Sequence, residues 1–518
     1  MKDKIKIVSP RAATNVILLA GIFLRFHHLF KIDFRYEPFR LGGLFVAFAE
    51  QIIQNGFRLP NLIPFYSEDG IPFAYPPLGF YVEAILLSLF PNNHILIANL
   101  LPPVISALSL IGVFLLLRWH YREQETYILT GTFAYAFLPL AFTNQIEAAG
   151  LAEAFGSWAL VFFFYTVIRF RSMPNWKNAV LTGVALGISF LSSPGSAIGV
   201  SLLSCLVVLE TLLKNKFSLQ AVGQVFVVVM TGMLLSMPYW ATVMSFHGRG
   251  IFFFPILAQY SSAEEPNFFR VFFQNLLSFA VVQDGSAFFW NLVIFLGMLW
   301  QVLYGKFSLP LSFLVLFAIP REGVWLTALP AALLFAHEFG DVILGLLHPA
   351  LDATKPAPRW GFTLLIIVFI GCWMAFQSFS VSDALVADRQ WKITPEQIKL
   401  VEDSRLLIPA DAKVLIIGND ALLEWSPYLL RREVINTKFG LEWKPERLQS
   451  VTLLNKRISE AQTWDDVLKA VTEFNGYQKV YVLSSEKKLL TALSRSSTVS
   501  FKLKIETPVI QLGILSMP

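Results

Sequence analysis

Acidic and basic residues of the kind that serve in group transfer gather in one stretch near the N-terminus. Asp33, Glu37 and Arg40 come first, with Glu37 three residues ahead of Arg40. A carboxylate beside an arginine can accept a proton or bind a cation. We expect a helix over residues 38–54, because Pro38 suits its first position and an Asn-Gly pair follows as a stop. The alternative is that Glu37 only caps this helix and pairs with Arg40.

A second acidic pair, Glu68-Asp69, precedes Gly70 in the same stretch. Adjacent acids before glycine commonly form a solvated turn. The functional alternative is a second catalytic acid, or ligands for a divalent metal such as Mg²⁺ or Mn²⁺. Tyr75 and Tyr81 follow and are candidates for substrate contacts, although aromatic side chains at a membrane interface would give the same pattern.

Three further residues could complete a site. Glu147 lies in a short segment, 144–148, that has no other charge. Arg249 and Arg321 could bind a phosphate, since arginine matches phosphate geometry with two parallel hydrogen bonds. Each is a weak signal alone, but all three fall between apolar segments on the side where the acids lie.

The composition shows where these residues must be held. The chain has 518 residues, of which 55% are hydrophobic and 15% charged, and its mean hydropathy is +0.58. A soluble protein of average composition has about 25% charged residues. We therefore expect a polytopic α-helical membrane protein embedded in the lipid bilayer. Basic residues form no cluster with interleaved polar residues, so a nucleic-acid partner is not expected.

A helix needs about 20 mostly apolar residues to cross a bilayer. Eleven segments are candidates: residues 14–31, 95–117, 127–143, 149–168, 178–193, 195–213, 219–240, 286–304, 308–320, 323–346 and 360–381. Residues 77–90 are also apolar, but they are few and include Glu83, so we expect them to lie at the interface.

Loop charges support that count. With the N-terminus inside, the outer loops at 144–148 and around Ser193 have no lysine or arginine, and the inner segments hold Lys2, Lys4, Lys6, Arg11, Arg118, Arg122, Arg169, Arg171, Lys177, Lys214, Lys216, Lys306, Lys355 and Arg359. Cytoplasmic loops carry such an excess of lysine and arginine. We therefore expect a cytoplasmic membrane protein with a cytoplasmic N-terminus. The long first loop, residues 32–94, and the C-terminal region would both lie outside the cytoplasm.

The chain changes character near residue 382. Short runs with strand composition appear at 413–418, 434–437, 479–483 and 501–506, and residues 463–474 fit an amphipathic helix capped by Thr463. We expect a transmembrane domain over residues 1–381 and a small extracytoplasmic α/β domain over 382–518. Within the former, Gly183/Gly187 and Gly195/Gly199 predict close helix packing.

These features together resemble the GT-C superfamily, polytopic glycosyltransferases that use polyprenyl-phosphate-linked sugars and include protein O-mannosyltransferases and the aminoarabinose transferase of lipid A. The resemblance extends over most of the chain. It rests on these short motifs: Leu24-Arg25, Glu37-Pro38-Phe39-Arg40, the Tyr75–Tyr81 run, Leu191–Pro194, Pro320-Arg321-Glu322, Trp325–Pro330, Glu424–Tyr428 and Arg431-Arg432.

The resemblance implies roles for individual residues. Glu37 occupies the position of the family's catalytic Asp, Pro38 that of the following Glu, and Arg40 that of the Arg. Glu37 would orient or deprotonate the acceptor hydroxyl, while Arg40, Arg321 and Arg249 would bind the donor phosphate. Tyr75 and Pro76 stand where one branch has an acid and a lysine, so the second carboxylate would be Glu68 or Asp69. Metal dependence stays open.

The expected activity is therefore transfer of a hexose or pentose from a polyprenyl-phosphate donor to a protein, lipid or polysaccharide acceptor outside the cytoplasm. A transporter or flippase of lipid-linked saccharides is the main alternative. Transporters usually place ionisable residues at mid-membrane, whereas the acids here gather in an outer loop. A non-catalytic scaffold of the cell envelope is the third possibility.

Overall fold

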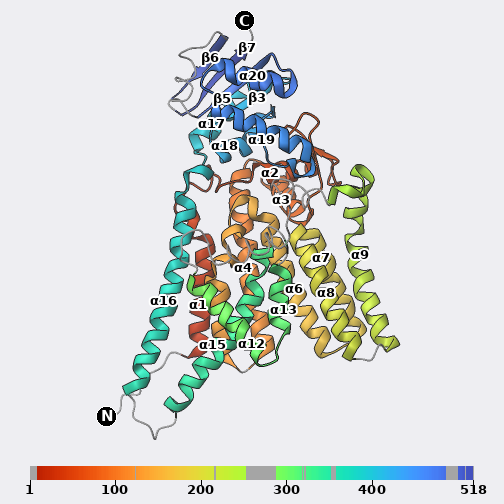
Figure 1. Ribbon diagram of the computed structural model, residues 1–518, viewed down its shortest axis with the longest axis vertical. Coiled ribbons are helices and arrows are strands. Elements are labelled where there is room, and N and C mark those ends of the chain that lie inside the picture. Colours follow the sequence, from red (N-terminus) through yellow and green to blue (C-terminus); the bar gives the residue numbers. More distant parts are fainter. Residues whose placement is uncertain are drawn as a thin grey trace.

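The computed structural model describes residues 9–122, 124–214, 218–252, 288–317, 319, 323–351, 358–485, 500–507 and 509–516. A bundle of long helices makes up one part of the molecule, and a sheet with helices lies at one end of it (Figure 1). The N-terminus is at the opposite end of the bundle. Arg321, predicted to bind phosphate, and the adjacent Glu322 lie outside the described residues.

The bundle is a polytopic membrane domain. Its helices overlap every predicted span: α1 (Pro10–Phe26), α4 (His94–Tyr121), α5 (Glu125–Phe137), α6 (Leu151–Ser172), α7 (Trp176–Ser192), α8 (Pro194–Lys214), α9 (Leu219–His247), α12 (Phe288–Leu303), α13 (Ser308–Phe317), α14 (Gly323–Leu326) with α15 (Ala328–Leu351), and α16 (Pro358–Ala387). Within the described residues, five helices are long and apolar enough to cross a bilayer, or six with the bent α5 pair. Several others are shorter, so the count of eleven spans stays a prediction.

A fully buried arginine stabilises the bend that follows α5. Pro139 begins a new short helix there at 77° to α5, because proline cannot donate the hydrogen bond that would continue the first. Carbonyl groups at the end of α5 are left without helical partners. The Arg25 guanidinium of α1 donates to the carbonyl oxygens of Tyr135 and Ala136, both at 3.2 Å. The intramembrane arginine therefore satisfies backbone groups that lipid cannot.

The glycines of α7 allow close contact with α9. A Cβ added at Gly183 would lie 2.6 Å from the Val228 carbonyl oxygen, and one at Gly187 would lie 2.8 Å from the Leu235 Cβ. Only glycine leaves room for this approach, which confirms the packing role predicted for this pair.

The first loop contains two short helices and a small hairpin: α2 (Gly43–Gln54), α3 (Leu78–Leu89), β1 (Leu62–Ile63) and β2 (Ile71–Pro72). The predicted helix over residues 38–54 is wrong at its start, because residues 38–42 are not helical and α2 begins five residues later. Its end at Asn55 is confirmed. Helix α3 has 12 residues, fewer than a bilayer requires.

The C-terminal region contains a five-stranded sheet in the order β4-β3-β5-β7-β6. The strands are β3 (Lys413–Ile417), β4 (Glu433–Val434), β5 (Lys479–Ser484), β6 (Ser500–Glu506) and β7 (Gln511–Ser516). β3 pairs in parallel with β4 and β5, whereas β7 pairs antiparallel with β5 and β6. Three of the four predicted strand runs are present; the run at 434–437 overlaps β4 only at Val434, and β7 is an additional strand.

Four helices accompany the sheet: α17 (Pro395–Ser404), α18 (Asp420–Leu430), α19 (Pro445–Glu460) and α20 (Trp464–Asn475). Thr463 caps α20 as predicted. A continuous hydrophobic core joins α18 and β3 to the first loop and includes Phe48, Phe80, Ile416 and Trp425. Helix α18 of the C-terminal region therefore lies directly on α2 (Figure 1).

Candidate active site

The segment between Glu37 and α2 is fixed by side chains and backbone from the bundle. Asn99 of α4 accepts a hydrogen bond from the Phe39 N–H at 2.7 Å and donates to the Glu37 carbonyl oxygen at 2.8 Å. The Ala149 N–H donates to the Leu41 carbonyl oxygen at 2.7 Å. The extended segment thus takes its hydrogen bonds from α4 and from the loop before α6, in place of a helix.

Helix α18 fixes the same segment from the other side. The Glu424 carboxylate accepts hydrogen bonds from the N–H groups of Gly42, Gly43 and Leu44 at 3.0, 2.9 and 2.7 Å. The N–H groups at the start of a helix have no acceptor within that helix. Glu424, far along the chain, supplies the acceptor here and so caps α2. A Cβ at Gly43 would lie 2.9 Å from the Trp425 Cα, which explains why glycine occupies this contact.

Two ion pairs meet within this segment. The Lys392 ammonium lies 2.9 Å from a Glu37 carboxylate oxygen, and the Arg40 Nε lies 3.1 Å from a Glu147 oxygen. The Arg40 guanidinium also lies over the Trp391 ring, 5.4 Å from its centroid. Because Trp391 and Lys392 are neighbours in sequence, both pairs belong to one cluster. Three residues of this cluster, Glu37, Arg40 and Glu147, were predicted site residues.

The backbone of Arg40 is strained. Its φ is 66°, in the left-handed region that costs a residue with a side chain roughly 1–2 kcal/mol. The Trp425 indole N–H donates to the Arg40 carbonyl oxygen at 2.9 Å and helps to hold this conformation. Strain of this kind persists where surrounding contacts fix it, and it is concentrated at functional sites.

Burial sets the electrostatics of the acids. It raises the pKa of Glu147, while the Arg40 charge lowers it. Burial also raises the pKa of Glu424 to about 7, against the three backbone N–H donors that lower it; repulsion from Glu147 adds to the rise. Glu147 and Glu424 thus repel each other, while the Arg40 guanidinium and the Lys392 ammonium belong to the same cluster. Such a combination of charges can exchange a proton or a phosphate.

The second predicted acidic pair lies elsewhere. Glu68 and Asp69 line a separate cavity of about 470 Å³, together with Lys444 and Arg447. Asn475 donates a hydrogen bond to Glu68 at 2.8 Å. These acids therefore face the C-terminal elements, and no contact joins them to Glu37 or Arg40 in the part of the chain that the structure describes.

The remaining predicted residues are spread over the first loop and α9. Tyr75 packs edge-on against Phe45 and Trp443, with ring centroids 5.5 and 4.9 Å apart, and the Tyr81 hydroxyl donates to the Phe57 carbonyl oxygen. Asp33 is exposed in the turn before Glu37. Arg249 is exposed in a short helix after α9. The Asp33 backbone carbonyl oxygen accepts a hydrogen bond from the Glu37 N–H at 2.7 Å, whereas Tyr75, Tyr81 and Arg249 have no described contact with the cluster.

The metal expectation does not fit these positions. Among the described residues, no three His, Cys, Asp or Glu side chains are arranged to hold a metal ion. Glu68 and Asp69 share their cavity with Glu446 and with the basic side chains of Lys444 and Arg447. The chemistry of the cluster is therefore derived from its side chains alone.

Solved structures show which fold this is. The chain is similar to ArnT from Cupriavidus metallidurans bound to undecaprenyl phosphate, with a TM-score of 0.58 and 15% identity over 96% of this chain and 97% of that one. AglB, the archaeal oligosaccharyltransferase from Archaeoglobus fulgidus in complex with an inhibitory peptide and a dolichol-phosphate, gives a TM-score of 0.58 and 15% identity over 98% of this chain and 74% of that one. The chain has the GT-C fold.

A mycobacterial arabinofuranosyltransferase, AftD, is also similar, with a TM-score of 0.53 and 13% identity over 98% of this chain and 40% of that one. No protein-family model and no curated protein matches the chain by sequence. The likeness to these GT-C proteins therefore rests on the three-dimensional structure. At such low sequence identity it shows a shared fold and nothing more.

The sequence predictions missed the residues that the C-terminal region contributes. Lys392 and Trp391 gave no signal, since they lie in a short stretch between α16 and α17. Glu424 and Trp425 belong to a motif that the resemblance singled out, but no spacing links them to residues near position 40. Only the folded chain brings them to Arg40.

An apolar groove lies along α4, the helix that carries Asn99. It has a volume of about 340 Å³ between α3 and α4 and is lined by residues that include Leu86, Phe90, Ile97 and Leu101. Ile97 and Leu101 are each two positions from Asn99, which binds the Glu37–Phe39 backbone. Residues two positions apart on a helix point to nearly opposite sides, so the groove lies on the other side of α4 from Asn99, at the same level along the helix.

Proposed function

We propose that the protein is a membrane glycosyltransferase that transfers a sugar from a polyprenyl-phosphate donor to an acceptor hydroxyl outside the cytoplasm. The observation that carries the proposal is the meeting of the Glu37–Lys392 and Arg40–Glu147 pairs at the junction of bundle and C-terminal region. The likeness to ArnT, a protein whose structure contains undecaprenyl phosphate, supports the choice of donor class.

The reaction is a direct displacement at the anomeric carbon. The acceptor oxygen forms a bond to that carbon as the bond to the phosphate oxygen breaks. Glu37 takes the proton from the acceptor hydroxyl, and the electron pair of the broken bond leaves with polyprenyl phosphate. Arg40 stabilises the charge that develops on this phosphate through parallel hydrogen bonds. Inversion at the anomeric carbon follows from a single displacement.

Each charged group has a partner in the resting site that substrate would replace. Lys392 holds the Glu37 carboxylate, and Glu147 holds the Arg40 guanidinium. Arg321 is proposed as a further phosphate ligand on the strength of the motif around it. We assign the acceptor side to Glu68, Asp69 and Arg249. Their positions at the outer surface would suit a polar substrate.

The donor chain would lie in the apolar groove between α3 and α4. This arrangement would place the prenyl tail in the bilayer at the level of Asn99, and the phosphate would have to reach past α4 to the Glu37–Arg40 segment. It requires that the first loop and the C-terminal region, residues 382–518, both face the outside of the cytoplasmic membrane. The eleven-span topology predicted from loop charges provides that orientation.

The test is sugar transfer by purified protein in lipid vesicles. Undecaprenyl-phosphate sugars serve as donors, and release of undecaprenyl phosphate is measured to avoid assuming an acceptor. Glu37→Gln should reduce release by at least about 100-fold, the usual contribution of a general base. Glu460→Gln, at an exposed acid at the end of α19, is the control and should retain activity. Full activity in Glu37→Gln would refute the role of Glu37.

A further inference from the structure

A second, larger cavity lies at the opposite end of the bundle from the candidate active site. Its volume is about 680 Å³, within the range of roughly 300–1,000 Å³ typical of ligand pockets. Residues of α4, α6, α8, α13 and α15 line it. This is the end where α1 begins and where the Arg11–Glu125 ion pair joins α1 to α5. The proposed transfer reaction does not use this cavity.

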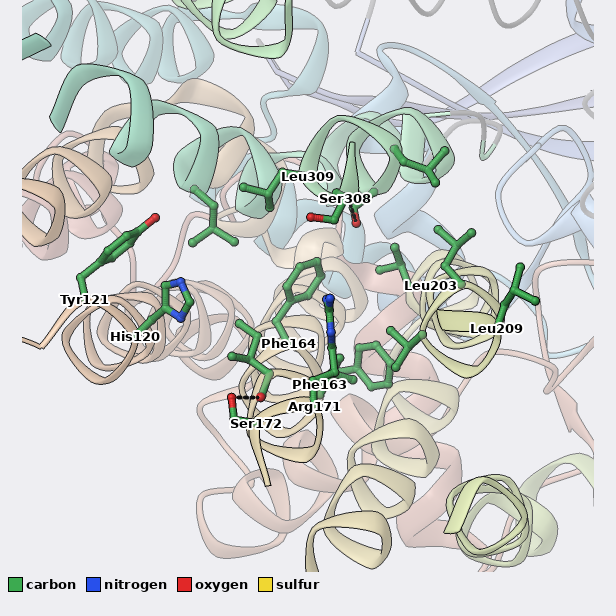
Figure 2. A pocket seen from close by; sticks show the side chains of 17 residues that line it. His120, Tyr121, Phe163, Phe164, Arg171, Ser172, Leu203, Leu209, Ser308 and Leu309 are labelled. Carbon is green, nitrogen blue, oxygen red and sulfur yellow. Dashed lines mark hydrogen bonds between the residues drawn. The ribbon is translucent and has the colours of Figure 1, made fainter. Parts of the chain in front are cut away.

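The cavity has an apolar interior and a polar mouth. Phe163 and Leu203 lie toward the middle of their helices and Leu333 lies in the second turn of α15, and all three side chains are buried. Arg171 and Ser308 lie at helix ends. Figure 2 shows the Arg171 side chain beside Phe163 and Phe164, with Ser308 and Leu309 across the cavity. A ligand that fits must therefore combine a hydrocarbon part with a polar end.

The cavity opens sideways between α8 and α13. Leu209 of α8 and Leu311 of α13 line it and are 53% and 43% exposed. Leucines exposed on the surface of a membrane bundle face lipid chains. A lipid can therefore enter from the bilayer without crossing a polar barrier, while a water-soluble ligand of the same size would have to displace lipid.

The charge around the mouth favours an anion. The neighbouring basic residues belong to the ends of α4 and α6 and to the link before α13: Arg118, Arg122, Arg169, Arg171 and Lys306. Three acids at this end have described contacts with side chains other than these. Glu125 pairs with Arg11, Gln301 donates to Glu338 at 2.7 Å, and Tyr127 donates to Asp341.

We propose that this cavity binds one anionic phospholipid of the leaflet that faces the N-terminus. The headgroup phosphate would contact Arg171 and the hydroxyl groups of Ser308 and Ser312, and an acyl chain would occupy the space bounded by Phe163 and Leu203. Basic pockets between transmembrane helices on the cytoplasmic side are a recurrent kind of lipid site. This site is independent of the proposed transfer activity.

The experiment is native mass spectrometry of the delipidated full-length protein in detergent, titrated with phosphatidylglycerol or phosphatidylcholine. Phosphatidylglycerol should bind at least about fivefold more tightly, the contribution expected of one basic residue near a headgroup. Arg171→Gln should remove that preference while binding of phosphatidylcholine stays unchanged. Lys177→Gln, at an exposed basic residue of the same bundle end that does not line the cavity, should keep the preference.

A second variant tests the location. Ser312→Trp places a large side chain at the mouth, where Ser312 is half-buried, and should abolish tight binding of phosphatidylglycerol. Equal affinity for the two lipids would overturn the proposal, and so would binding that Ser312→Trp leaves unchanged. Tighter binding of undecaprenyl phosphate than of phosphatidylglycerol in the cavity would also overturn it, because the cavity would then serve the donor.

Discussion

The Glu424 carboxylate accepts a hydrogen bond from the Leu44 backbone N–H at 2.7 Å across 380 positions of sequence. This contact makes the start of α2 depend on a helix in the C-terminal region. The segment before α2 carries Glu37 and Arg40, so the geometry of the candidate active site depends on the same contact. Residues of the C-terminal region are therefore part of the site and also part of what holds it in place.

Glu424→Ala should destabilise the protein and disorder the site. It would leave three buried N–H groups without acceptors, and an unsatisfied buried donor costs about 1–3 kcal/mol. The expected result is a thermal unfolding midpoint several degrees lower and loss of transfer, measured on the same preparation. Glu460→Ala provides the control. An unchanged midpoint would mean that water or another group caps α2.

Glu424 should also make stability depend on pH. Burial raises its pKa to about 7 in the folded protein, above the ordinary value of 4.5. The folded state then binds more protons than the unfolded state between these values, so stability falls as pH rises from about 4.5 to 7. One pKa unit corresponds to about 1.4 kcal/mol, which gives roughly 3 kcal/mol in all.

The measurement compares unfolding midpoints of the wild type and Glu424→Gln between pH 5 and pH 8. Glutamine keeps one acceptor oxygen and cannot titrate. The midpoint of the wild type relative to the variant should therefore fall over this interval. A constant difference would show that the carboxylate stays ionised throughout and that its three backbone donors outweigh burial.

Local signals in the sequence were enough to predict local structure. The cap at Thr463, the strand runs such as Lys413–Ile417 and the stop at Asn55 each depend on residues within one turn, and each is present. The glycines at 183 and 187 predicted close packing because the GxxxG spacing is itself local. The prediction of a polytopic helical bundle depended only on the length of each apolar segment.

The site could be predicted only in part, because its contacts are distant in sequence. The helix expected from Pro38 begins at Gly43, since Glu424 and Asn99 take the hydrogen bonds of the preceding segment. Glu37, Arg40 and Glu147 were identified individually, but their partners were not. Nothing in the sequence near Lys392 indicates that it faces Glu37 across more than 350 positions.

Lys392 should influence transfer through Glu37. We expect Lys392→Met to reduce kcat/KM by about 100-fold, because a misplaced catalytic group costs this much even when it is only about 1 Å away from its position. Lys392→Arg keeps the charge and should recover most of the activity. The measurement is the release of undecaprenyl phosphate at several pH values, with folding checked by the thermal midpoint.

Lys399→Met is the matched control for this pair, since Lys399 lies on α17 in the same region and contacts none of the cluster residues in the described contacts. A structural role for Lys392 would lower the thermal midpoint and leave the pH profile unchanged. If Lys392 positions Glu37, the variant should shift the acidic limb of the pH profile of undecaprenyl phosphate release. Its thermal unfolding midpoint should then stay nearly constant. Wild-type activity in Lys392→Met would mean that the ion pair has no part in the reaction.

The strained backbone of Arg40 allows charge and conformation to be separated. Both Arg40→Ala and Arg40→Gly remove the partner of Glu147, and both should lose donor-phosphate binding, with transfer reduced at least about 100-fold. They differ in the backbone, because only glycine adopts a φ of 66° without cost. Arg40→Gly should therefore be more stable than Arg40→Ala by about 1 kcal/mol.

The comparison needs unfolding midpoints and transfer rates for the two variants side by side. Equal stabilities would show that the segment relaxes to an ordinary conformation once the side chain is gone, so that the pairs with Glu147 and Trp391, and not the Trp425 contact, impose the left-handed φ. Retained transfer in Arg40→Gly would remove Arg40 from the proposed phosphate site, because glycine keeps the backbone path of the segment and deletes only the charge.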